Sequence, residues 1–334
     1  MKKRLLFAPL LFALVFVFAF SGCTSYRDCP LEIDGAYIPP GVYCYYLDLV
    51  LSSPKKYGAK KDDRESVMSA AETLCKNYVA AQSYALQNKI TLEQDLKSEA
   101  SSEADGKKAL FGAYYQKIGV SKADLYKVCL SEKYKKEIVR RYFGAGGKKE
   151  VSTDKLKEKF VELYVGFKAI EAPLTKVNTK GETGPLSSRE KADLEEEFEK
   201  MAKRLNSGAD IDSVNESYCK KMNLVATQKL EINVISKSSS LYDEDFFEKI
   251  EAVPHGSAAV IESGSWLYLV ERFTIATNDD DAFEQYRSEV LESLKMPWVE
   301  KTIASAASKY NVTTREKRAK KLFEIVLKGR ESFS

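Results

Sequence analysis

Histidine is nearly absent from this chain of 334 residues, in which His255 is the only one. A single histidine removes the commonest mixed cysteine–histidine ligand sets of zinc, which need two histidines. His255 stands between Pro254 and Gly256, which is a turn sequence. We therefore expect a solvent-facing histidine without a catalytic or metal-binding role.

The chain also lacks an excess of charge of one sign once its first residues are set aside. Lys2, Lys3 and Arg4 are three of the 52 basic residues, so the chain without residues 1–22 carries 49 basic against 49 acidic residues. A balanced chain has no electrostatic footprint for the phosphates of nucleic acid. We therefore expect no nucleic-acid partner.

Cysteines are few, and their spacing matches no zinc pattern. Cys23 belongs to the N-terminal motif described below, which leaves Cys29, Cys44, Cys75, Cys129 and Cys219. Five thiols cannot all pair within one chain. A disulfide between Cys29 and Cys44 is one alternative in an oxidising exterior, whereas free, partly buried thiols are the plainer expectation. The sequence predicts neither a metal ion nor a cofactor.

A long apolar run lies at the N-terminus. Three basic residues precede the 16-residue run Leu5–Phe20, and Ser21-Gly22-Cys23 follows it, which is the layout of a signal peptide. The run is shorter than the roughly 20 residues that span a bilayer, so a permanent transmembrane helix is the weaker alternative. Phe20-Ser21-Gly22-Cys23 resembles the bacterial lipobox. The resemblance implies that residues 1–22 are removed and that Cys23 carries lipid at the outer face of the cytoplasmic membrane, with an ordinary secretory signal as the alternative.

In the first third of the chain after Cys23, the sequence predicts a helical unit that begins with a small strand or hairpin. The hairpin is expected at 31–40. Apolar periodicity and capping patterns predict helices over 41–52, 64–89, 109–118 and 122–143, with a further helix starting at 91–94. The polar, small residues 98–108 predict a mobile stretch.

The middle of the chain has a mixed pattern. A helix is expected over 152–164 and a loop over 177–185. Strands are predicted over 165–173, 230–236 and 265–274, and helices over 187–206, 210–218 and 242–250. This β-α-α-β-α-β order in about 110 residues suits a small α+β domain with helices on an antiparallel sheet. Two last helices, expected at 279–310 and 313–328, suggest that this domain is inserted into a discontinuous helical unit.

The order of these elements resembles the SurA/PrsA family of exported foldases, in which a helical chaperone unit flanks a parvulin-type prolyl isomerase domain. The resemblance covers roughly Leu31–Lys328. It rests on Tyr114–Ser121, the Asp124–Phe143 helix, Val151–Leu156, Val165–Ile170, Met201–Ile211 and Gly264–Val270. It implies a signal peptide at 1–22, a tether at 23–30, a helical chaperone domain at 31–164, a degenerate parvulin-like domain at 165–276 and C-terminal helices at 277–334 that complete the helical domain.

The resemblance also locates where an isomerase site would lie. A parvulin site uses two histidines in the middle of its sheet, and the two positions fall on Ala169 and Trp266. Cys219 lies close to the nucleophile-like position of the family. Since neither imidazole is present, the resemblance implies no catalytic residue. The alignment is testable, because it places Ala169 and Trp266 side by side on adjacent strands.

Three aromatic residues are candidates for a peptide-binding groove, namely Phe167, Trp266 and Tyr268, although alternate strand residues must face the core. We expect a membrane-anchored, extracytoplasmic foldase-like chaperone that binds unfolded or nascent exported polypeptides without isomerase activity. One alternative is an active prolyl isomerase in which Cys219 helps to shape the slot. Another is an envelope assembly lipoprotein with one dominant partner, and a homodimer stays open.

A basic run near the C-terminus allows two interpretations. Arg318 to Lys321 is most simply a solvated face of a helix. It could also lie against anionic lipid headgroups, because the chain is tethered to the membrane nearby.

Overall fold

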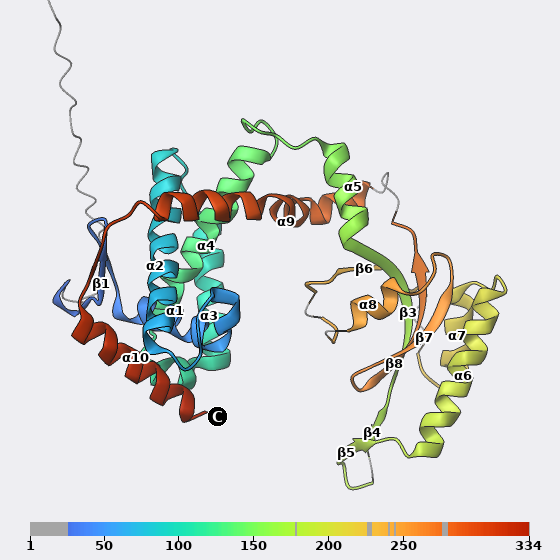
Figure 1. Ribbon diagram of the computed structural model, residues 1–334. Helices are drawn as coiled ribbons and strands as arrows, with labels where there is room; N and C mark the ends of the chain where they lie inside the picture. Colours follow the sequence, from blue (N-terminus) through green and yellow to red (C-terminus); the bar gives the residue numbers. More distant parts are fainter. Residues whose placement is uncertain are drawn as a thin grey trace, which may run out of the picture. The chain divides into compact units, whose positions relative to one another are not determined.

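The computed structural model describes residues 26–177, 179–225, 229–239, 241–243, 245–275 and 280–333 (Figure 1). The predicted signal segment, Cys23 and the start of the predicted tether lie outside the described residues. The protein is α+β and divides into two compact units: unit 1 comprises residues up to Lys148 and from Lys295, and unit 2 comprises Lys149–Leu294. Among the described residues, no helix combines the length and apolarity needed to cross a membrane.

Two helices of unit 1 begin where a short polar side chain, Asp63 or Ser121, caps them. Helix α4 (Lys122–Phe143) starts with a capping box, in which the backbone N–H of Asp124 donates to Ser121 Oγ and that of Ser121 donates to the Asp124 carboxylate. The other elements are α1 (Pro40–Ser52), α2 (Arg64–Gln87), α3 (Gln94–Lys117), α10 (Glu316–Glu331) and 3₁₀ turns at Tyr26–Asp28 and Pro54–Tyr57. Helix α9 (Asp280–Ala307) runs from unit 2 into unit 1.

A small antiparallel sheet joins residues from both ends of unit 1. Strand β1 (Leu31–Ile33) pairs with β2 (Ala36–Ile38) and with β9 (Val312–Thr314). The turn between β1 and β2 has positive φ at Asp34 and Gly35, as a tight two-residue hairpin requires. The predicted hairpin at 31–40 is confirmed, whereas β9 was not predicted.

A hydrogen-bond network around Asp48 connects helix α10 to α1 and α3. The guanidinium of Arg330 donates to the Asp48 carboxylate and, over 2.8 Å, to Ser52 Oγ. The hydroxyl of Tyr114, in α3, donates to the same carboxylate. These bonds fix the end of α10 beside α3.

Unit 2 is built around a four-stranded antiparallel sheet of order β6-β3-β8-β7. The strands are β3 (Tyr164–Pro173), β6 (Asn233–Ser236), β7 (Ala258–Ser263) and β8 (Trp266–Phe273). Helices α6 (Ser188–Asn206) and α7 (Ile211–Lys221) cover one face and α8 (Phe246–Glu251) covers the other (Figure 1). Successive residues of β3 therefore point to opposite cores: Phe167 and Ala169 toward α8, Ile170 and Ala172 toward α6 and α7.

Helix α5 (Thr153–Leu163) and the first turns of α9 pack together in unit 2. The ring of Phe160 stacks on that of Tyr286, with centroids 5.9 Å apart, and also contacts Phe283. Tyr164, the first residue of β3, lies 4.8 Å from Tyr286 between ring centroids. An aromatic cluster thus joins these two helices to the sheet.

The predicted mobile stretch at 98–108 is wrong, because these residues lie inside α3. Ala100 and Ala104 are fully buried on one side of the helix. Glu99 and Glu103 pair with Lys133 Nζ of α4 at 2.9 and 2.6 Å. The small side chains of Ala100 and Ala104 allow α3 to lie close to α4, and the two ion pairs with Lys133 stabilise this contact.

Two predictions for unit 2 need correction. The segment 177–185, predicted as a loop, contains the ends of a hairpin formed by β4 (Thr175–Val177) and β5 (Thr183–Pro185). Strand β7 was not predicted, so the expected three-strand order lacked one edge of the sheet. The helices predicted at 187–206 and 210–218 are confirmed as α6 and α7, with ends differing by up to three residues.

Candidate functional site

The two positions aligned with the parvulin histidines do not lie side by side. Ala169 of β3 stands opposite Val270, whereas Trp266 of β8 stands opposite Pro173, four residues further along β3. At about 3.3 Å per residue this separates them by roughly 13 Å. The expectation of a side-by-side pair is wrong, so the absence of isomerase activity cannot be argued from these two positions and remains a proposal.

Cys219 does not join Ala169 either. It lies in α7, within the core that contains Ile170 and Ala172. Ala169 points to the opposite core, on the α8 side. The buried Cys219 thiol lies 3.5 Å from Asn215 Oδ1 and takes part in helix packing. The structure therefore does not assemble a centre from Ala169, Trp266 and Cys219.

Two of the three peptide-binding candidates are core residues. Phe167 is fully buried and Tyr268 is nearly so, because both pack against Phe246 beneath α8. Burial also raises the pKa of Tyr268 to about 12. Trp266 differs, with 42% of its surface exposed at the start of β8. Only Trp266 can contact a peptide in this conformation.

The charged pair inside unit 2 has a structural role. Lys168 is buried, and its Nζ donates over 2.8 Å to the Asp212 carboxylate at the start of α7. Asp212 also accepts from the backbone N–H of Leu230 over 2.7 Å. The bond from Lys168 lowers the pKa of Asp212. Both oxygens are occupied, so the carboxylate fixes the segment before β6 and is not free to act on a substrate.

His255 and the cysteines that the structure describes form no metal site. His255 lies exposed in a turn, as predicted. The cysteines after Cys23 are all buried and free in this structure, so the alternative of a Cys29–Cys44 disulfide is not realised. Within the described ranges, acidic, histidine and cysteine side chains do not converge as a metal site requires.

Side chains bond to several backbone groups at both edges of the unit 2 sheet. Backbone groups of Ala258, in β7, bond to the side-chain amide of Asn206 at 2.8 and 2.9 Å, and Lys249 Nζ donates to the Glu262 carbonyl over 2.7 Å. On the other edge, the Tyr286 hydroxyl donates to the Val234 carbonyl over 3.1 Å. Occupied edge groups disfavour the addition of a further strand from another chain.

Unit 1 carries an exposed apolar surface that we call the α3 patch, made of Leu110, Phe111, Ala113, Tyr114 and Phe333. It surrounds a hollow of about 450 Å³. Leu110, Phe111 and Phe333 are 76%, 55% and 54% exposed. Helix α3 is interrupted here, since Phe111 has φ −129° and ψ 21°. The Phe333 ring packs edge-on against Tyr114, with centroids 5.4 Å apart.

The α3 patch was missed in the sequence. Leu110 and Phe111 are consecutive, and consecutive helical residues point about 100° apart. Such pairs are both buried elsewhere in unit 1, as Leu322 and Phe323 are in α10, so the sequence pattern does not identify this pair as exposed.

A second hollow lies beside β6 in unit 2. Its volume is about 380 Å³, and its lining includes Ile232, Val234, Tyr242, Phe273 and Tyr286. A third, of about 550 Å³, lies in unit 1 and includes charged residues such as Lys56, Glu132 and Lys135. Of the three, the α3 patch alone is lined entirely by apolar and aromatic side chains.

Comparisons with known proteins give structural likenesses only. No family model matches the chain, and no curated protein sequence matches it. Crystal structures of three foldases are similar to it: PrsA from Streptococcus pneumoniae strain Canada MDR_19A (14% identity, 84% of this chain and 93% of that chain covered, TM-score 0.37), PrsA from Bacillus subtilis (14%, 72% and 83%, 0.33) and PrsA from Lactococcus lactis (12%, 89% and 98%, 0.35). At such low identities and TM-scores these likenesses establish neither a common fold nor a common function.

Proposed function

We propose that this chain is a membrane-anchored, extracytoplasmic foldase-like chaperone that holds unfolded exported polypeptides and has no isomerase activity. The α3 patch carries the proposal. A contiguous group of large, exposed apolar side chains indicates a binding surface. Weak contacts with such side chains suit extended, unfolded clients of varied sequence, and they require neither a cofactor nor ATP.

Other features of the chain support this assignment. Side chains bonded to both sheet edges of unit 2 disfavour clients that bind by strand addition and favour binding through side-chain contacts. The lipobox at Phe20–Cys23 supports a location at the outer face of the membrane, where newly exported chains emerge unfolded. The order of helical and α+β segments resembles that of exported foldases.

The first test is suppression of aggregation by a soluble form that starts at Thr24. We expect this form to slow the aggregation of several unfolded clients. The double variant Leu110→Ser/Phe111→Ser should need about thirty-fold more protein for the same protection, because each exposed apolar side chain contributes about 1 kcal/mol when a client covers part of it. Light scattering at a series of protein concentrations measures both.

The matched control is Leu224→Ser/Ile232→Ser, which removes two similarly exposed apolar side chains from unit 2. It should protect clients as the unmodified protein does. An equal loss in this control would remove the α3 patch from the proposal. A lack of protection by the unmodified protein against every client would overturn the chaperone function itself.

The isomerase alternative is decided separately. Rotation about a prolyl bond has a barrier of about 18–20 kcal/mol, which an enzyme lowers only in a slot with converging groups. Cys219 and Ala169 face opposite cores of unit 2, so they do not form one. We therefore expect no acceleration of proline-limited refolding at stoichiometric protein, with a known isomerase as positive control. Any acceleration would contradict this part of the proposal.

A further inference from the structure

We infer that the solvent-facing side of α10, together with the exposed side chains of Tyr26 and Tyr37, is a contact surface for anionic membrane lipid. We call it the membrane face and define it as Tyr26, Tyr37, Lys317, Lys321 and Lys328. The inference rests on the proposed function in one respect, since lipidation of Cys23 would bring this surface to the bilayer. The charge and the exposure of the membrane face are those of residues that the structure describes.

Tyr26, Asp28 and Cys29 are bonded to arginines at the start of α10. Arg315 Nη1 donates to the carbonyl oxygens of Tyr26 and Cys29 over 2.8 and 2.7 Å. Arg318 donates to the Asp28 carbonyl over 3.1 Å and pairs with its carboxylate. Tyr26 is three residues after Cys23, and three residues span at most about 11 Å. A lipid on Cys23 therefore holds the first turn of α10 close to the headgroups.

The lysines of α10 fall into two groups. Lys320 pairs with Glu316 and Glu65, at 3.3 and 3.6 Å. Lys317, Lys321 and Lys328 are exposed and form no ion pair with any residue that the structure describes. Spacings of four and seven residues place these three on one side of the helix.

Acidic residues near this side are largely compensated. Glu324 lies between Lys321 and Lys328, but it pairs with Arg64 Nη1 at 3.5 Å. Glu316 is engaged by Lys320, and Glu32 lies 3.9 Å from Arg315. Glu331 is exposed three residues after Lys328, so the three outward lysines and this carboxylate together keep a net charge of +2 along the helix.

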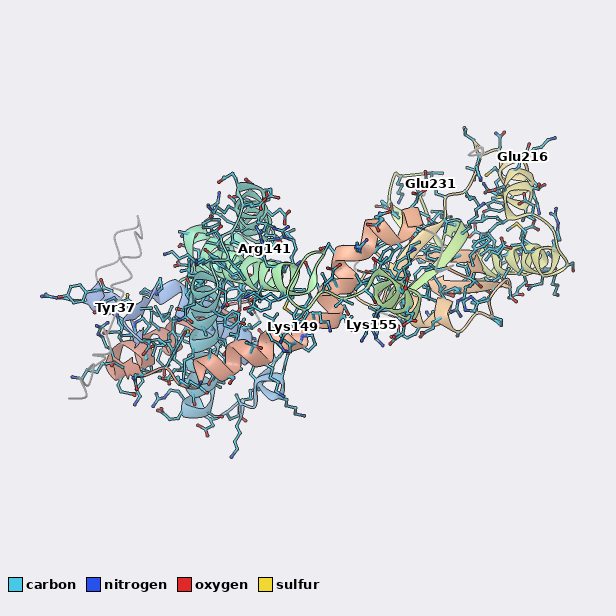
Figure 2. All side chains as sticks on the ribbon, turned by 90° about the horizontal axis from the view of Figure 1, so that it is seen from above. Tyr37, Arg141, Lys149, Lys155, Glu216 and Glu231 are labelled. Atoms are coloured by element: carbon cyan, nitrogen blue, oxygen red, sulfur yellow. The ribbon has the colours of Figure 1, made fainter. Side chains whose placement is uncertain are left out.

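Two tyrosines continue this surface beyond the start of α10. Tyr26 and Tyr37 are 55% and 39% exposed, and their ring centroids lie 6.0 Å apart. The Arg315 guanidinium lies over the Tyr37 ring, 5.5 Å from its centroid. Tyr37 lies at the outer edge of unit 1 (Figure 2). Tyrosine suits the headgroup region because its ring is apolar and its hydroxyl is polar, and the adjacent anchor favours lipid over a protein partner.

The test uses the chain from Thr24, which carries no lipid, with vesicles at low salt. We expect more co-sedimentation with vesicles of phosphatidylcholine and phosphatidylglycerol than with phosphatidylcholine alone. A basic residue near an anionic surface contributes about five-fold to binding, so Lys317→Gln/Lys321→Gln should weaken partitioning by roughly 25-fold. The control Lys200→Gln/Lys203→Gln removes two exposed lysines from α6 and should change it little.

Three outcomes would overturn the inference: equal partitioning into the two kinds of vesicle, an equal loss in the α6 control, or a self-association of the chain that the Lys317/Lys321 variant abolishes. The last would assign this surface to a second copy. None of these results depends on lipidation of Cys23, which the mass of the protein purified from membranes reports, or on client binding, which the aggregation assay reports. Failure of the proposed function and failure of the membrane face are therefore distinguishable.

Discussion

Replacing Phe246 with alanine should lower the free energy of unfolding of unit 2 by about 3–5 kcal/mol. Phe246 is fully buried, and its ring centroid lies 4.3 Å from that of Tyr242 and 4.7 Å from that of Tyr268. Strand β8 holds Tyr268 in place, so the cavity left by the ring cannot close. Urea unfolding followed through Trp266 measures the change, in a chain whose Trp298 is replaced by phenylalanine so that fluorescence reports unit 2.

The neighbouring residue provides the control. Phe247 has the same side chain and lies in the same helix, but it is only partly buried. Phe247→Ala should cost about 1 kcal/mol, since less apolar surface returns to water. Similar losses in the two variants would mean that Phe246 is not the centre of this core.

The helices could be predicted because their signals are local. The capping boxes Ser121/Asp124 and Ser187/Glu190 each involve residues three apart, and they start α4 and α6 where predicted. The apolar period between caps then fixes the length of each helix. Nothing outside a few turns of chain is needed for these predictions.

The strands were less predictable because their partners are distant. Strand β9 is three residues long, and its partner β1 lies near the other end of the sequence. β7 (Ala258–Ser263) contains small residues and lacks a clear polar–apolar alternation. The register of β3 against β8 is set by the two opposed cores, and no short turn joins the two strands. The sequence therefore could not place Ala169 relative to Trp266.

The extent of the helical part illustrates the same limit. Residues 31–164 were expected to form its first section, yet α5 belongs to unit 2. Phe160 of α5 packs against Phe283 and Tyr286, more than a hundred residues later in the chain. Helical periodicity predicts which residues share a side of a helix, but not which element covers that side.

The candidate site was predicted least well for a related reason. Phe167 and Tyr268 are aromatic strand residues, and the sequence pattern does not decide between a groove and a core for them. The α3 patch, in turn, combines Leu110 and Phe111 with Phe333 at the other end of unit 1. Only the packing of α10 against α3 brings these side chains together and leaves them uncovered.

The packing of α10 against α3 leaves no room for a side chain at Gly329, so Gly329→Ala should destabilise unit 1 by about 1–2 kcal/mol. Gly329 is a buried residue of α10, and an added Cβ would lie 2.6 Å from Ile118 Cγ2 and 3.1 Å from Ile118 N. Overpacking at such short distances from backbone costs about 2–3 kcal/mol, the upper part of the usual range, and the helix-propensity gain of about 1 kcal/mol offsets only part of this cost. Urea unfolding followed through Trp298, in a chain with Trp266→Phe, measures the balance.

The same substitution at Gly106 should have the opposite sign. Gly106 is an exposed residue inside α3, and a Cβ built there meets nothing within 4 Å, so alanine should stabilise unit 1 by about 0.8–1 kcal/mol. If both variants stabilised the unit, α10 would not lie this close to α3. Because Phe333 follows α10, a displacement of that helix by Gly329→Ala should also reduce client protection, while Gly106→Ala should leave it intact.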